Sequence, residues 1–417
     1  MTIDSIHIIQ NPQRRMQRLG FLKYLVYQAS KRNTSTLQLL GNNLISAVSK
    51  KVSVPATAEL VDYFSVTLRE QRDKSMLAKV KEAIERSGND SMVSVQIQDA
   101  YLASKNLPSQ RGRLVLNDIK FFPSLATNLG LLRKSSYTPL VRGLVLLQLV
   151  SVHENSAFSE YNKNLNPLIL TIEQKLLLLF TLIEHDEHIL LPLHHALLLH
   201  NDEFADWEAG NLLPEIMRGI CQQYRPLVRS GADAVFLRKL WDTAEVIEQW
   251  KGKPYSGKGA RDENATIRLE PFVDIGVFSK KDKFAYQYQF TPVGRHIMSG
   301  LTEDEKGGSK LDDRFFSLAT AAYGISTTHL SKPDDIMHFV YLSYKNLASP
   351  LGYAPIREVL LLAAILAIST NSGYFEIADG FDVLKSEQKA NPKSIIFNVD
   401  RMGRLNIVKF TGTYTSK

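Results

Sequence analysis

The sequence of 417 residues holds a single cysteine, Cys221. One thiol excludes an intramolecular disulfide and any zinc site built from several cysteines. Such sparing use of cysteine is typical of proteins in a reducing compartment. We therefore expect a cytoplasmic protein, whose length is sufficient for two to four domains with their own apolar cores.

Long apolar runs are also missing. The best candidates, 144–150, 175–183 and 359–368, are too short to cross a bilayer and end at charged or turn residues. The N-terminal sequence MTIDSIHIIQNPQRRMQRLG lacks the apolar core and the small-residue cleavage site of a secretory signal. We therefore expect no membrane partner.

The chain also lacks the motifs of the common enzyme classes. In the segment 252–259, GKPYSGKG, a glycine stands where a phosphate-binding P-loop needs Ser or Thr, so a flexible basic loop at 251–262 is the better interpretation. The acidic pair 334–335 and the triplet 387–389 do not lie on the strand that a nuclease core requires, and no nucleophile elbow is present. We therefore predict no enzyme and no cofactor.

Half of the ten histidines lie between positions 185 and 200, beside several acidic residues. His185 and His188 have a spacing that could chelate a transition metal, but no HExxH motif is present. The apolar run 189–193 predicts a short strand, which would separate the two groups of histidines. A polar turn beside a core strand is the favoured interpretation, and we predict no metal site.

Basic residues are what the sequence has in excess, since 50 Lys and Arg face 43 Asp and Glu and give a net charge of +7. The excess is strongest in residues 1–33, which form either a basic arm or the solvated face of a first helix. The basic residues of this segment are Arg14, Arg15, Arg18, Lys23, Lys31 and Arg32. A positive balance favours a polyanionic partner.

The most informative segment is FVDIGVFSKKDKFAYQYQFTPVGRHIMSG, at 272–300. An apolar run at 272–278 and an alternating run at 284–290 predict two strands, joined by a lysine-rich turn at 279–283. The Thr-Pro pair that follows predicts the N-cap and first turn of a helix. The segment therefore predicts a two-stranded ribbon with a basic tip, attached to a helical body.

The order of elements repeats three times along the chain: a long apolar helix, a short strand, two helices and a strand–turn–strand. The first copy ends with a compressed ribbon at 133–143. In the third copy, we expect a short strand at 373–377, a second helix at 379–388, a third helix at 393–402 and a strand at 404–410. The fold class is therefore mainly α with small β-ribbons, that is, α+β.

These copies divide the chain into five parts. They are a basic N-terminal arm or helix (1–33), a first module (34–150), a second module with an insertion (151–300), a linker with a helical connector (301–354) and a third module (355–417).

This layout resembles that of tandem winged-helix DNA-binding proteins. It is similar to the three-module recognition regions of some type IIS restriction enzymes and to the winged-helix scaffolds of bacterial defence systems. The ribbon followed by Thr-Pro-x-Gly carries the resemblance most specifically. The resemblance implies that the third helix of each module lies in a major groove and that the ribbon, or wing, touches the DNA backbone.

Basic side chains at the expected wings and third helices are the candidate nucleic-acid contacts, and ordinary surface charge is the alternative at each. In the second module they are Lys280, Lys281 and Lys283 at the wing tip, with Arg238 and Lys239 on the helix that would precede the wing. In the first module they are Arg111, Arg113, Lys120, Arg133 and Lys134, and in the third they are Lys389, Lys393, Arg401 and Arg404.

We favour a non-catalytic protein that binds double-stranded DNA, as the recognition subunit of a larger bacterial complex for restriction or anti-phage defence. The alternative is a protein-interaction scaffold, similar to the kleisin-type subunits that bridge ATPases. In that scaffold the apolar helices 176–183 and 359–368 would supply interfaces, unless they are plain core. A nuclease or ATPase partner, or a second copy, fits either hypothesis, and the choice between DNA and RNA stays open.

Overall fold

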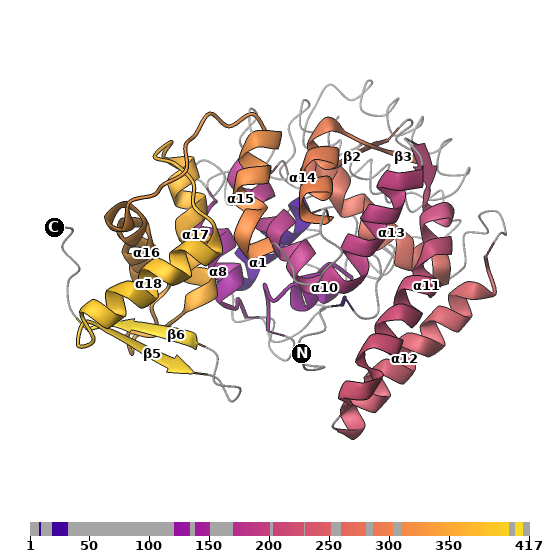
Figure 1. Cartoon of the computed structure of the whole chain (residues 1–417), viewed down its shortest axis with the longest axis horizontal. Coiled ribbons are helices and arrows are strands. Elements are labelled where there is room, and N and C mark those ends of the chain that lie inside the picture. Colours follow the sequence, from indigo (N-terminus) through magenta and orange to yellow (C-terminus); the bar gives the residue numbers. More distant parts are fainter. Residues whose placement is uncertain are drawn as a thin grey trace, which may run out of the picture.

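The computed structural model describes residues 8–9, 19–31, 121–133, 138–150, 170–200, 203–228, 230–251, 260–280, 287–302, 311–399 and 405–411. Within these ranges the chain is mainly helical, with two small antiparallel sheets of three strands each (Figure 1). This confirms the α+β class. None of the described helices is long and apolar enough to span a membrane.

Three N-terminal helices pack together: α1 (Gly20–Lys31), α7 (Phe121–Asn128) and α8 (Val141–Gln148). The expected basic first helix is partly a core helix, because Leu22, Leu25 and Val26 of α1 are buried. Even Lys23 is buried, and its ammonium donates a hydrogen bond to Gln174 Oε1 at 3.0 Å.

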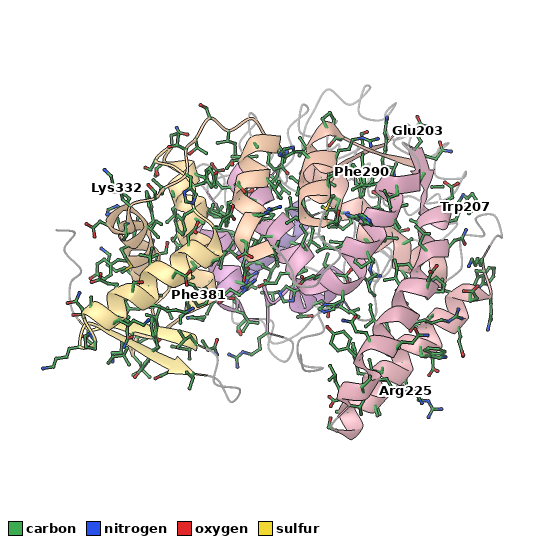
Figure 2. The ribbon with its side chains drawn as sticks, in the orientation of Figure 1. Glu203, Trp207, Arg225, Phe290, Lys332 and Phe381 are labelled. Carbon is green, nitrogen blue, oxygen red and sulfur yellow. The ribbon has the colours of Figure 1, made fainter. Side chains whose placement is uncertain are left out.

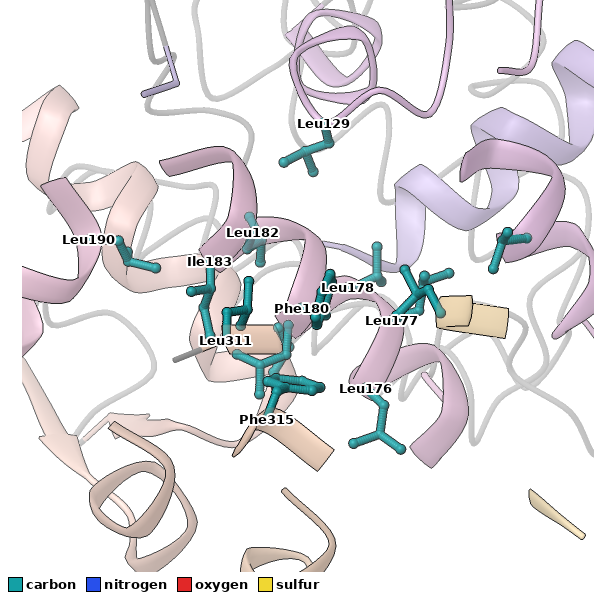
Figure 3. Close-up of a cluster of buried hydrophobic side chains, with 14 of the residues drawn as sticks. Leu129, Leu176, Leu177, Leu178, Phe180, Leu182, Ile183, Leu190, Leu311 and Phe315 are labelled. Atoms are coloured by element: carbon teal, nitrogen blue, oxygen red, sulfur yellow. The ribbon is translucent and has the colours of Figure 1, made fainter. Parts of the chain in front are cut away.

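The central helix, α10 (Ile172–His200), supplies most of the core shown in Figure 3. It bends at Asp186, whose backbone angles are not helical. The predicted strand at 189–193 is wrong, since these residues continue the helix. The reason is periodicity: Ile189, Leu193 and Leu197 are all buried, at the spacing of one helix face.

The elements that follow form a central unit, residues 172–302. After α10 they are β1 (Glu203–Ala205), α11 (Asp206–Tyr224), the 3-10 turn η2 (Arg225–Leu227), α12 (Gly231–Glu248), α13 (Ala260–Ile275), β2 (Phe278–Lys280), β3 (Gln287–Phe290) and α14 (Pro292–Thr302). The sheet order is β1-β3-β2, and both outer strands run antiparallel to β3. The second strand of the predicted ribbon and the helix after it are confirmed as β3 and α14.

Two predictions for this unit are wrong. The apolar run 272–278 is mostly the last turn of α13, which ends at Ile275. Gly276 follows with a left-handed φ of 89°, and only Phe278 of the run enters β2. The expected loop 251–262 overlaps the start of α13, a helix that the sequence analysis missed. This helix is buried on all sides from 264 to 272, so it has no polar face to reveal its period.

A C-terminal unit, residues 311–411, holds the second sheet. Its elements are α15 (Leu311–Ala322), α16 (Pro333–Leu347), β4 (Ala354–Pro355), α17 (Ile356–Ser369), α18 (Ile377–Ala390), β5 (Ile395–Val399) and β6 (Leu405–Phe410). The sheet order is β4-β6-β5. The strand expected at 404–410 is confirmed as β6.

The third helix expected at 393–402 is wrong, because residues 395–399 form strand β5. The sequence Ile-Ile-Phe-Asn-Val is rich in β-branched and aromatic residues, which favour a strand. The strand expected at 373–377 is only an isolated bridge between Tyr374 and His329. As a result α18, expected as the second helix of this unit, is the helix that directly precedes the hairpin.

The two sheets share one topology. In each, a helix leads into the first strand, further helices follow, and a hairpin returns so that its second strand lies between the other two. The central unit differs by one inserted helix, α12, which packs with α11 as a helical hairpin at one end of the molecule (Figure 1).

The corner between α7 and α8 repeats the corner between α13 and α14. Gly143 and Gly294 stand at the same place in the helices that follow, and a Cβ there would come within 2.2 Å of Leu131 O and 2.0 Å of Val277 O, respectively. Only glycine permits these approaches. A single antiparallel bridge, Leu132 to Pro139, stands where the second corner has its hairpin, which fits the compressed ribbon expected there.

Candidate nucleic-acid interface

Among the described residues, α18 is a helix that directly precedes a hairpin and has one face exposed to solvent. Ile377, Gly380 and Leu384 face the core, and a Cβ at position 380 would meet Leu360 Cδ2 at 2.7 Å. The glycine therefore lets α18 lie close against α17. This packing directs the opposite face to solvent, where the exposed residues are Asp382, Lys385, Ser386, Lys389 and Ala390.

The start of α18 is fixed by its own side chains. The backbone N–H of Glu376 donates to Asp379 Oδ2 at 3.0 Å, which caps the first turn. The Glu376 carboxylate accepts bonds from the backbone N–H groups of Phe316 and Ser317 on α15, at 2.9 and 2.7 Å. Burial nevertheless raises the pKa of Glu376, and these bonds oppose that rise. The helix is thus held in place at its N-terminal end.

Three exposed lysines lie along the C-terminal half of α18 and the turn after it. Lys389 lies in its last turn and Lys393 lies in the turn before β5, and both are exposed. Lys385 is also exposed, and its ammonium is 3.7 Å from Asp382. Two of the predicted contacts, Lys389 and Lys393, therefore lie exposed at the end of α18 and in the turn that follows it. Ser386, on the same exposed face of α18, is a candidate that the sequence did not indicate.

The equivalent place in the central unit is covered. The helix before its hairpin is α13, which is buried among α10, α11 and α12. Lys280 is not at an exposed tip: its ammonium pairs with Glu270 Oε1 at 2.7 Å, and its side chain is only 5% exposed. Tyr288 donates to the same oxygen at 2.6 Å. Lys280 therefore anchors the base of the hairpin to α13. Its charge is not available at the surface of the protein.

The remaining described candidates lie apart from α18. Arg238 and Lys239 are exposed on α12, and Arg133 is exposed beside the first corner. Figure 2 shows Phe381 of α18 near one end of the molecule and Arg225, at the tip of the α11–α12 hairpin, near the other. One compact patch therefore does not unite them. Eight candidates lie outside the described residues: Arg111, Arg113, Lys120, Lys134, Lys281, Lys283, Arg401 and Arg404.

The histidine-rich segment serves the core of the central unit. His194 is fully buried, and its Nε2 lies 3.1 Å from the carbonyl oxygen of Arg268. The rings of Phe272 and Phe278 lie 5.0 and 5.1 Å away. Burial lowers the pKa of His194 to about 4, so the imidazole is neutral at pH 7. His188 bonds the hydroxyl of Tyr224 at 2.9 Å.

The apolar helices that the scaffold hypothesis offered as interfaces are core. Residues 176–183 of α10 are almost completely buried, and so is nearly all of 359–368 in α17. Comparison with known proteins finds no matching family model, no matching curated protein and no matching solved structure.

Proposed function

We propose that this chain binds double-stranded DNA through its C-terminal unit, acting as a winged helix. In this proposal α18 enters the major groove and the β5–β6 hairpin lies along the backbone. The observation that carries it is the exposed face of α18, placed directly before a hairpin whose sheet has the order β4-β6-β5.

The charges of this surface support the proposal. Lys389 and Lys393 follow one another at the end of the helix and the start of the hairpin, where the backbone of a bound duplex would pass. Arg401 and Arg404, between the two strands in sequence, stay predicted contacts. Lys385 and Ser386 on the helix face are of the types that reach base edges or phosphates.

Of the two helices that precede a hairpin in the described residues, the proposal assigns the reading role to α18 alone. Because α13 is buried, it does not enter a groove, and the central unit contributes at most through the basic turn of its hairpin. We propose that the chain is a recognition subunit, whose catalytic or motor activity lies in a partner of the same complex.

The test is a salt titration of binding to a random duplex. We expect Lys389→Ala/Lys393→Ala to weaken binding at all sequences and to reduce the slope of log K against log salt by about one per lysine lost. The matched control is Arg238→Ala/Lys239→Ala, which removes the same charge from α12 at the other end of the molecule.

We expect only the Lys389→Ala/Lys393→Ala variant to lose affinity for duplex DNA. Equal loss in both variants would mean that net charge alone attracts DNA, and it would contradict the assignment of α18. If the unaltered chain has no measurable affinity for duplex DNA at low salt, the DNA-binding proposal is discarded.

A protein-interaction scaffold is the second candidate, and a separate observation favours it. The helical hairpin of α11 and α12 carries exposed apolar side chains on α12, namely Val235 (52% exposed), Trp241 (37%) and Val246 (44%). A stoichiometric partner that is lost with Val246→Asp but kept with the matched surface change Ala234→Asp would support this function.

A further inference from the structure

A chain of alternating charges crosses the interior where α8, α10, α15 and α17 meet. Arg142 on α8 donates from Nη1 to Glu184 Oε2 at 2.7 Å and from Nη2 to Glu358 Oε1 at 3.1 Å. Arg357 on α17 donates from Nε to the other oxygen of Glu184 and holds both carboxylate oxygens of Asp312 at 2.8 Å. The order of this charge chain is Glu358–Arg142–Glu184–Arg357–Asp312.

Glu184 is the centre of the charge chain. Its side chain is 10% exposed and that of Arg142 is 5% exposed, whereas Arg357 and Asp312 reach 33% and 37%. Burial alone would raise the pKa of Glu184, but Arg142 and Arg357 outweigh it and lower the pKa to about 2. The carboxylate is therefore ionised at neutral pH, with one arginine on each of its oxygens.

Each arginine comes from a different part of the molecule. Arg142 belongs to the N-terminal helices, Glu184 to the central unit, and Arg357 with Asp312 to the C-terminal unit. The contact from Arg142 to Glu358 joins residues 216 positions apart in sequence. The charge chain therefore links the described parts of the molecule at one place.

Aromatic packing lies directly beside these charges. Phe180 of α10 packs edge to face against Phe315 and stacks on Phe316, with ring centres 5.2 and 6.3 Å apart, respectively. The guanidinium of Arg357 lies 5.4 Å from the Phe180 ring centre. Figure 3 shows Phe180 and Phe315 within the same core cluster. The burial of apolar surface around these rings supplies attraction, but the hydrophobic effect itself has no preferred direction.

We propose that the charge chain is an orientation lock, which fixes the C-terminal unit in one direction against α8 and α10. Forked arginine–carboxylate contacts have a fixed geometry, so they select one arrangement among those that the apolar surfaces permit. A buried ion pair adds little net stability of its own, and its best-attested role is this kind of specificity. The proposal does not depend on DNA binding, although the lock would set the direction in which α18 points.

The test measures the distance between two spin labels by pulsed electron paramagnetic resonance. The labels are placed on Glu215→Cys of α11 and Ser386→Cys of α18, both exposed positions, in a Cys221→Ala background that removes the chain's one native cysteine. With the charge chain intact, we expect one narrow distance distribution. Glu184→Gln, which leaves two arginines facing a neutral amide, is expected to broaden and shift it.

Glu248→Gln is the matched control. It removes the carboxylate of a surface pair, Arg218 Nη1 to Glu248 Oε2 at 3.4 Å, and is expected to leave the distribution unchanged. A folded Glu184→Gln variant with the unaltered distribution would overturn the proposal. If that variant does not fold, Arg357→Lys decides, because lysine keeps the charge and loses the fork: a shifted distribution supports the lock, and an unchanged one rejects it.

Discussion

At the scale of single residues, Lys280 shows how far a side chain can depart from the role that its sequence suggests. Three lysines in a predicted turn indicate a phosphate contact, yet the first of them points inward to Glu270. The sequence does not reveal this, because the partner lies ten positions earlier in α13, a helix with no polar face. Exposed Lys389 and Lys393 follow from the sequence more directly, since they flank Asn391-Pro392, a strong turn signal.

Replacement of Lys280 by methionine tests this inward role. We expect Lys280→Met to destabilise the fold by about 3–5 kcal/mol, because it leaves the fully buried Glu270 without its cation. Urea unfolding measures the loss. The double variant Lys280→Met/Glu270→Gln should recover much of it, and a single variant as stable as the unaltered protein would contradict the buried pair.

His194 gives the fold a dependence on pH. Its pKa is about 4 in the folded chain and about 6.5 when unfolded, so the unfolded state binds a proton first as the pH falls. Stability should therefore be complete above pH 6.5 and decline toward pH 4, by up to about 3 kcal/mol. We expect His194→Leu to flatten this part of the profile in urea unfolding, whereas the exposed His338→Gln keeps the slope of the unaltered chain.

At the scale of elements, the sequence is most informative where a turn signal stands beside a clear period. The second strand of the ribbon, β3, and the start of α14 were predictable, because strand alternation runs directly into a Thr-Pro helix start. α13 was not predictable, since it combines burial on all sides with Pro271 and four buried polar residues. The buried polar side chains find their partners only in the folded chain. For example, Arg268 Nε lies 2.7 Å from Asp186 Oδ2 on α10.

The prediction of β5 failed for a different reason. The expected order of elements included a strand at 373–377, and each later element was shifted by one place as a consequence. The local sequence of 395–399 favours a strand on its own, but the layout required a helix there. As a consequence, Lys393, which was expected at the start of a third helix, lies in the turn between α18 and β5.

The repeated corner offers a test of element geometry. We expect Gly294→Ala to destabilise the fold by about 1–3 kcal/mol or more, because the new methyl group meets the backbone carbonyl of Val277. Gly219→Ala is the matched control, since its new methyl group, at an exposed position of α11, would have no atom within 4 Å. That change should stabilise the helix by about 0.5–1 kcal/mol. Thermal or urea unfolding that ranks the two variants otherwise would contradict this corner.

At the scale of the whole molecule, two units with the same sheet topology differ in the exposure of the helix before the hairpin. The C-terminal unit leaves the helix before its hairpin exposed, whereas the central unit buries the equivalent helix beneath α11 and the inserted α12. The exposed helix, α18, and the α11–α12 hairpin lie toward opposite ends of the long axis of the molecule (Figure 1).

The charge chain also has a consequence for the order of folding. The corners join residues fewer than twenty positions apart, so they close quickly, whereas Arg142 and Glu358 must meet across 216 positions. We expect this meeting to come after the rate-limiting step, once each unit has formed. Glu184→Gln should then speed unfolding and leave the refolding rate nearly unchanged in stopped-flow measurements. A slower refolding rate would instead place the junction of the units in the folding nucleus.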